Sequence, residues 1–147
     1  MASRHLTAVV SRPADEVGAR LADFGAIASW APQVDHSRLL TDGVDGVGAV
    51  RRVQTGRQTL LETITVWEPR RLLGYRVAGL PALIGDFTTT WELAGEGQGQ
   101  TRVTVRSELR PGVPRPLAAL VLVRLKREGG RLLEGLRAAL EAPGAAR

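Results

Sequence analysis

The sequence predicts a single α+β domain in which a curved, seven-stranded antiparallel sheet is covered on one face by a long C-terminal helix. Seven β-rich runs are separated by short turns rich in Gly and Pro, and short links of this kind join antiparallel strands. The C-terminal part of the chain instead repeats leucine at helical spacing, and no other helical segment is long enough to cover a sheet. Because sheets twist, this sheet can wrap partly around the helix and leave a pocket between them.

The strands follow from alternating or β-rich runs that end at turn residues. The first strand spans His5–Val10. The glycine-rich segment Gly95–Gly99 joins two strands and starts no helix, so it is a hairpin loop rather than a phosphate-binding loop. The other strands are expected at Val34–Leu40, Val47–Gln54, Thr59–Trp67, Leu72–Val77, Asp86–Leu93 and Thr101–Leu109.

Helices are expected after the first strand and at the end of the chain. Ser11 is the expected N-cap of the first helix, whose first turn carries proline and acidic residues that suit its dipole. A second, short helical turn spans Ala26–Trp30. The long helix spans Pro116–Leu140, and the pair Gly129-Gly130 interrupts its pattern and predicts a bend there.

The composition fits one globular domain that spans residues 1–147. No internal repeat, low-complexity segment or linker divides the 147 residues. The chain has no Cys, which excludes disulfides and Cys-ligated metals and suits a reducing compartment. No apolar run is long enough to span a membrane, and the first residues lack the apolar stretch of a signal peptide. We therefore expect a cytoplasmic protein.

The net charge of +5 raises the question of nucleic-acid binding. Lys126 is the only lysine, and the arginines are scattered along the sequence rather than gathered in one stripe. Aromatic residues make up only 4% of the chain, too few for an obvious base-stacking platform. We therefore expect no nucleic-acid partner.

Element order and three motifs together suggest a family. The order is one strand, two short helices, six strands and one long helix, and the motifs are Ser29-Trp30-Ala31-Pro32, the stretch Glu62–Leu72 and Thr101–Thr104. These features resemble the START / Bet v 1-like (SRPBCC) superfamily, and within it the bacterial polyketide cyclase/dehydrase group. The resemblance covers essentially the whole chain and implies the helix-grip fold. The superfamily includes lipid carriers, plant hormone receptors and aromatic cyclases, so function has to be argued from the site.

The resemblance draws attention to Glu62, because plant abscisic-acid receptors of this fold carry a Glu that points into the cavity from the corresponding strand. The alternative is an exposed carboxylate that pairs with a cross-strand arginine such as Arg52. His36 stands where those receptors carry a cationic cavity residue, and it would be the natural partner of Glu62. The alternative for His36 is a surface position on an edge strand.

Side chains of several strands are expected to form the pocket wall. Phe87, Thr89 and Trp91 share one face of their strand, and Thr89 and the hydroxyl of Tyr75 would supply polar points in that wall. Trp30 would lie near the mouth of the pocket or cap the core. The full set of expected ligand contacts is Trp30, His36, Glu62, Tyr75, Phe87, Thr89, Trp91, Leu120 and Arg124.

The strand Thr101–Leu109 gives two conflicting indications. Val103, Val105 and Ser107 lie on one face, and Arg106 lies on the other with Thr104 and Glu108. Hydrophobicity turns the valines inward, whereas the resemblance turns Arg106 inward. The sequence leaves both readings open.

Two functions are compatible with these residues. Two His without Cys disfavour a structural zinc site, and no nucleophile elbow, P-loop or dinucleotide-binding motif is present, so no cofactor is expected. The first hypothesis is a carrier or sensor of a lipid, polyketide or isoprenoid-like molecule. The second is a polyketide cyclase/dehydratase in which Glu62 and His36 move protons, which requires both side chains to point inward.

The start of the last helix has more apolar residues than one buried face needs. Leu117, Leu120, Val121 and Leu125 suffice to cover the sheet, which leaves Leu122 and Val123 pointing elsewhere. The first helix and its following loop, a second subunit, or a membrane could cover these two residues. In the last case Arg115 and Arg124 would meet lipid phosphates.

Overall fold

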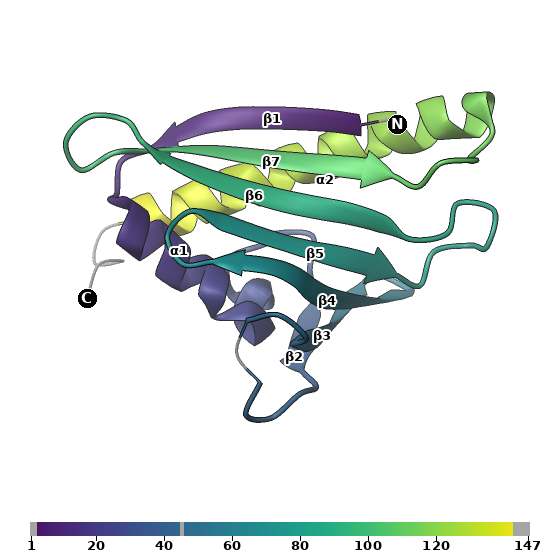
Figure 1. Ribbon diagram of the computed structural model, residues 1–147, viewed down its shortest axis with the longest axis horizontal. Helices are drawn as coiled ribbons and strands as arrows, with labels where there is room; N and C mark the ends of the chain where they lie inside the picture. Colours follow the sequence, from purple (N-terminus) through teal and green to yellow (C-terminus); the bar gives the residue numbers. More distant parts are fainter. Residues whose placement is uncertain (1–2, 45, 143–147) are drawn as a thin grey trace.

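The computed structural model describes residues 3–44 and 46–142 and confirms the predicted fold class. One antiparallel sheet has the strand order β1-β7-β6-β5-β4-β3-β2 (Figure 1). From β2 to β7 each strand pairs with its neighbour in the chain, and β1 pairs with β7. The strands are β1 (Ser3–Val10), β2 (His36–Leu39), β3 (Val50–Thr55), β4 (Gln58–Glu68), β5 (Leu72–Ala78), β6 (Phe87–Gly95) and β7 (Thr101–Leu109).

The helices are α1 (Ala14–Ala22), the 3-10 helix η1 (Phe24–Ser29) and α2 (Arg115–Glu141). α2 lies along one face of the sheet and packs mainly on β1 and β7, whereas η1 packs on β2 and β3 (Figure 1). In the described part of the chain, no helix is long and apolar enough to cross a membrane. Because α2 packs mainly on β1 and β7, it does not lie directly on the inner faces of β4, β5 and β6. α1 covers part of β6, and Phe24 of η1 packs against Tyr75 of β5.

One expectation about the helix ends was wrong. Pro13, not Ser11, is the N-cap of α1, and no side chain caps that helix. The backbone N–H of Ser11 instead donates to a carboxylate oxygen of Glu141 at 2.8 Å, and this bond is the main cause of the lowered pKa of Glu141. α2 runs unbroken through Gly129 and Gly130, and the bend expected at this pair stays a prediction.

A glycine determines how closely the second half of α2 approaches the rest of the molecule. A Cβ atom at Gly135 would lie 2.5 Å from the carbonyl oxygen of Trp30 and 2.6 Å from a ring carbon of Pro32. Only glycine permits this contact without a shift of one backbone. The contact holds the segment after η1 against the helix, at one side of the space that remains between helix and sheet.

Burial shows which faces of β4 and β7 point inward. Glu62 and Ile64 are buried on β4, whereas Leu61 is exposed. A register shift between Ile64 and Val66 marks a β-bulge, which re-aims the strand beyond it. On β7 the valines and Ser107 are buried, so hydrophobic alternation was right and the inward orientation of Arg106 implied by the resemblance was wrong.

Candidate ligand-binding cavity

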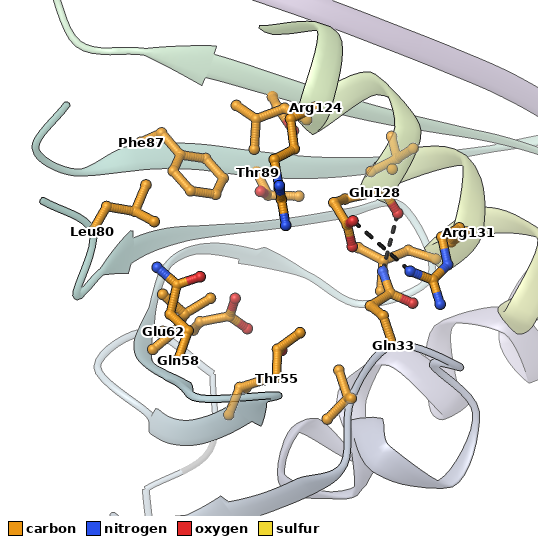
Figure 2. Close-up of a pocket in the computed structure, with 18 of the residues that line it drawn as sticks. Gln33, Thr55, Gln58, Glu62, Leu80, Phe87, Thr89, Arg124, Glu128 and Arg131 are labelled. Atoms are coloured by element: carbon orange, nitrogen blue, oxygen red, sulfur yellow. Dashed lines mark hydrogen bonds and ion pairs between the residues drawn. The ribbon is translucent and has the colours of Figure 1, made fainter. Parts of the chain in front are cut away.

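A cavity of about 570 Å³ lies between the sheet and α2. Inward side chains of β3 to β7 form its floor, and the middle of α2 forms its roof with Val121, Leu125 and Leu132. Leu80 and Ile84, from the segment between β5 and β6, stand at its edge (Figure 2). The volume lies within the range that small-molecule sites usually have, and most of the wall is apolar.

Polar side chains form a short row across the floor. Tyr75, Thr89 and Ser107 lie directly opposite one another on the neighbouring strands β5, β6 and β7. All three are buried and line the cavity. Adjacent strands are about 4.8 Å apart, so these three polar residues follow one another across an otherwise apolar surface.

Glu62 stands at the inner end of the cavity (Figure 2). It forms a buried ion pair with Arg51. The two residues are cross-strand partners on β3 and β4, and Arg51 Nε lies 2.7 Å from Glu62 Oε1. Burial of a lone carboxylate is costly, so the guanidinium supplies the compensation that allows Glu62 to face this space. No hydrogen bond to Oε2 of Glu62 is formed within the described residues, so this oxygen is available to a ligand.

Arg51 itself is held from three sides. Its guanidinium lies 3.7 Å from the ring centroid of Phe24 and 4.8 Å from that of Tyr75, and its Nη1 donates to the carbonyl oxygen of Phe24 at 2.9 Å. Phe24 begins η1, so Arg51 connects η1 to the sheet through one hydrogen bond and one cation–π contact, both to Phe24. The orientation of Glu62 is therefore fixed by contacts on the side away from the cavity.

The phenol of Tyr75 is a very weak acid in this position. Burial, and next the charge of Glu62, raise its pKa from 10.0 to about 12. Trp91 Nε1 donates to the Tyr75 oxygen at 3.2 Å, which leaves the phenolic proton available to donate. At neutral pH Tyr75 is thus a hydrogen-bond donor to a carbonyl or hydroxyl oxygen rather than a base.

Polar and charged side chains of α2 and of the segment after η1 gather at the mouth of the cavity. Gln33 Nε2 donates to the backbone carbonyl of Glu128 on α2, while Gln33 Oε1 is buried and has no hydrogen-bond partner in the part of the chain that the structure describes. Arg131 lies 3.9 Å from the Glu128 carboxylate. Arg124 extends from α2 into the opening, and within the described residues it forms no ion pair (Figure 2).

Most of the residues expected from the sequence line this cavity. They are Glu62, Tyr75, Phe87, Thr89, Leu120 and Arg124, whose contact with a ligand stays a prediction. Trp30 and Trp91 are buried behind the wall, where their rings meet edge to face at 6.0 Å. His36 is exposed on the edge strand β2 and does not line the cavity, so the expected Glu62–His36 pair is wrong.

Two residues of the site were missed from the sequence. Ser107 completes the hydroxyl row, and Arg51 rather than Arg52 pairs with Glu62. The hairpin turn contains the signal for Arg51, because a two-residue loop at Gly56-Arg57 sets Arg51 directly opposite Glu62. For metals, residues 3–44 and 46–142 contain no group of three His, Asp or Glu side chains that could hold an ion.

Fold and cavity together define a helix-grip protein with a ligand-sized apolar space. The chain belongs to the family described as polyketide cyclase / dehydrase and lipid transport, whose model matches residues 1–141. No curated protein matches the sequence.

Solved structures share the fold at low sequence identity. An uncharacterized protein from Bacillus thuringiensis has a TM-score of 0.76 at 19% identity, with 94% of this chain and 98% of that chain covered. The Zhui aromatase/cyclase from a Streptomyces species has a TM-score of 0.73 at 20% identity, with 97% and 99% covered. The protein Ara h 8.0201 has a TM-score of 0.75 at 13% identity, again with 97% and 99% covered.

Proposed function

We propose that this protein binds an apolar small molecule, such as a lipid, polyketide or isoprenoid-like compound, in the cavity between the sheet and α2, as its carrier or sensor. The single observation that carries the proposal is the unfilled, largely apolar cavity of about 570 Å³. Side chains do not fill this space, although close packing is the rule in protein interiors. The ligand would enter past Leu80, Ile84 and Leu120.

The polar groups in the wall narrow the class of ligand. Glu62 Oε2 can only accept a hydrogen bond in the ion pair, so it favours a ligand with a hydroxyl or amine donor at its inner end. Thr89 and Ser107 can donate or accept, and Tyr75 donates. A mainly apolar molecule with a hydroxyl group at the inner end and one or more oxygens along its length satisfies all of them.

The test compares 2-naphthol with 2-methoxynaphthalene, which has the same ring system but no donor. Titration monitored by fluorescence should show both ligands binding, with 2-naphthol tighter by about tenfold or more because its donor meets a charged acceptor. In Glu62→Gln the amide can turn its NH₂ toward the cavity, so the preference for the hydroxyl should fall. A melting curve of this variant checks that it remains folded. Failure of both ligands to bind the folded protein would contradict the proposal.

A second candidate, a polyketide cyclase/dehydratase, is favoured by the family match and by the aromatase/cyclase among the similar folds. In this version Glu62 Oε2 would take a proton from an activated carbon, while Tyr75, Thr89 or Ser107 would donate to the carbonyl oxygens. His36 takes no part, because it lies outside the cavity.

Turnover separates the two candidates. An enzyme would convert a short poly-β-ketone thioester to a cyclised product that mass spectrometry detects as loss of water, and Glu62→Gln would lower the rate far more than it lowers binding. Binding without conversion, by wild type and variant alike, would support the carrier or sensor.

A further inference from the structure

We infer that the mouth of the cavity docks on the surface of an anionic lipid membrane, through a mouth patch formed by Leu83, Leu120 and Val123. This inference rests on the proposed function, because the membrane would be the place where the apolar ligand is loaded or released. The three residues are 63%, 71% and 58% exposed, respectively. Leu120 lines the cavity, and Leu83 and Val123 are next in the sequence to the lining residues Ile84 and Arg124. Large apolar side chains left in water beside one opening indicate a surface that is covered in use.

The three residues belong to one surface although they come from two segments. Leu120 and Val123 are three residues apart on α2 and therefore neighbours on one helix face. Leu83 lies in the segment between β5 and β6, which projects from the same end of the molecule as the start of α2 (Figure 1). Arg110, which precedes α2, ties the two segments together by donating to the carbonyl oxygens of Ile84 at 3.0 Å and Ala82 at 3.1 Å.

The charges around the patch favour an anionic partner. From Arg115 to Arg127, α2 carries four cationic residues and no acidic one. Within the described chain, none of Arg115, Arg124, Lys126 and Arg127 forms an ion pair. An exposed apolar helix face flanked by cations is the pattern of helices that lie on an anionic membrane surface. A second copy of this chain fits poorly, because a symmetric contact would bring the two sets of cations together.

A second exposed apolar pair provides the contrast. Val44 and Val47 are also exposed, on the loop between β2 and β3. That loop carries the acidic Asp42 nearby and no cation, and in Figure 1 it lies far from the start of α2. Val47 therefore serves as a matched control for Val123: a similarly exposed valine outside the cationic surface.

The test is flotation with vesicles of phosphatidylcholine alone and vesicles of phosphatidylcholine mixed with phosphatidylglycerol. The wild type should bind the anionic vesicles, and more salt should weaken that binding. Val123→Asp should weaken it about tenfold or more, because it removes a valine that lipid would cover. Arg127→Glu should weaken it about fivefold for each unit of charge changed. The control variants are Val47→Asp and Arg38→Glu, and Arg38 is exposed on β2. Both should bind the vesicles like the wild type.

Light scattering and 2-naphthol titration complete the experiment. Equal binding to both kinds of vesicle, binding to neither, or a dimer that Val123→Asp separates would each overturn the membrane inference. None of these outcomes affects the proposed function if 2-naphthol still binds, because Val123 does not line the cavity. Loss of 2-naphthol binding in the wild type would instead contradict the proposed function itself.

Discussion

The two ends of the cavity differ in which side chains are buried and which have a specific partner. At the inner end the charged and aromatic residues Arg51, Glu62 and Tyr75 are buried, and each has a specific partner. At the mouth, Leu120 and Arg124 reverse this arrangement: the apolar side chain is in water, and the charged one has no ion-pair partner among the described residues.

This difference separates residues whose loss should destabilise the fold from residues whose loss should not. A buried ion pair strongly destabilises a protein when one partner is lost, because the other charge remains in an apolar setting. An exposed side chain without a partner contributes little to stability. Variants of the inner end should therefore change stability, whereas variants of the mouth should change binding and leave stability nearly unaltered.

The largest effect is expected from Arg51→Met. This change leaves the Glu62 carboxylate buried without its partner and removes the connection to η1, so the free energy of unfolding should fall by about 3–5 kcal/mol. The exposed neighbour Arg52 is the control, and Arg52→Met should change stability by less than about 0.5 kcal/mol. Urea denaturation measures both. Equal effects of the two variants would contradict the comparison.

The double variant Arg51→Met, Glu62→Leu sharpens that result. If the loss in Arg51→Met arises from an uncompensated charge, then removing Glu62 as well should restore most of the stability. A double variant that is less stable than Arg51→Met would show that packing, rather than charge, dominates at this end.

Alkaline pH tests the burial of Tyr75, which is the only tyrosine of the chain. Its pKa is raised from 10.0 to about 12 in the folded protein, so the folded state holds this proton more tightly than the unfolded state. The associated stability is fully present below pH 10 and is lost as the pH rises toward 12, a fall of about 3 kcal/mol. Tyrosinate absorbance should show the high midpoint, and Tyr75→Phe should remove this part of the pH dependence. A midpoint near 10 would mean that Tyr75 is solvated.

Two glycines of α2 differ in the space around them: Gly135 is tightly packed, and Gly130 has room for a Cβ atom. A Cβ at Gly135 would clash with the Trp30 carbonyl, so Gly135→Ala should destabilise the protein by about 1–3 kcal/mol. A Cβ at Gly130 would make ordinary contact with Leu6 at 3.6 Å, so Gly130→Ala should stabilise the helix by up to about 1 kcal/mol. Thermal unfolding gives both signs. The same sign for both would disprove the close approach at Gly135.

The smallest effect is expected at Arg124. Arg124→Leu should leave the melting temperature unchanged, because the side chain is exposed and forms no ion pair within the described residues. Binding of the 2-naphthylacetate anion should weaken by about two- to fivefold, the scale of an exposed ion pair, while 2-naphthol should bind as before. Equal losses for both ligands would show that Arg124 acts through packing rather than charge.

The sequence predicted the overall architecture because hydrophobic alternation and turn residues are local signals. The inward orientation of Val105 on β7 follows from alternation alone. The partner of Glu62 could not be assigned without the length of the Gly56-Arg57 turn, because a shift of one residue in register exchanges Arg51 and Arg52. Of the two alternatives for His36, the structure has the surface position, because its strand is the edge of the sheet, where a side chain can remain in water.

The sequence also did not predict which face of α2 is turned toward the sheet. Its first turns are apolar nearly all round, so periodicity does not define which leucine faces the sheet. In the structure Leu122 is buried in line with Leu133, Leu136 and Leu140, whereas Leu120, expected to cover the sheet, is exposed. Of the three possible covers for Leu122 and Val123, the first helix and its following loop do not cover Val123, because that residue is exposed.

Native mass spectrometry of protein purified from its own cells tests the central claim most directly, with Thr89→Trp and Thr88→Trp as a matched pair. These adjacent threonines lie on opposite faces of β6, Thr89 in the cavity floor and Thr88 in water. The account predicts a bound small molecule in the wild type and in Thr88→Trp, and its loss in folded Thr89→Trp, where the indole occupies the cavity. A bound molecule retained equally by both variants, or none in the wild type, would contradict it.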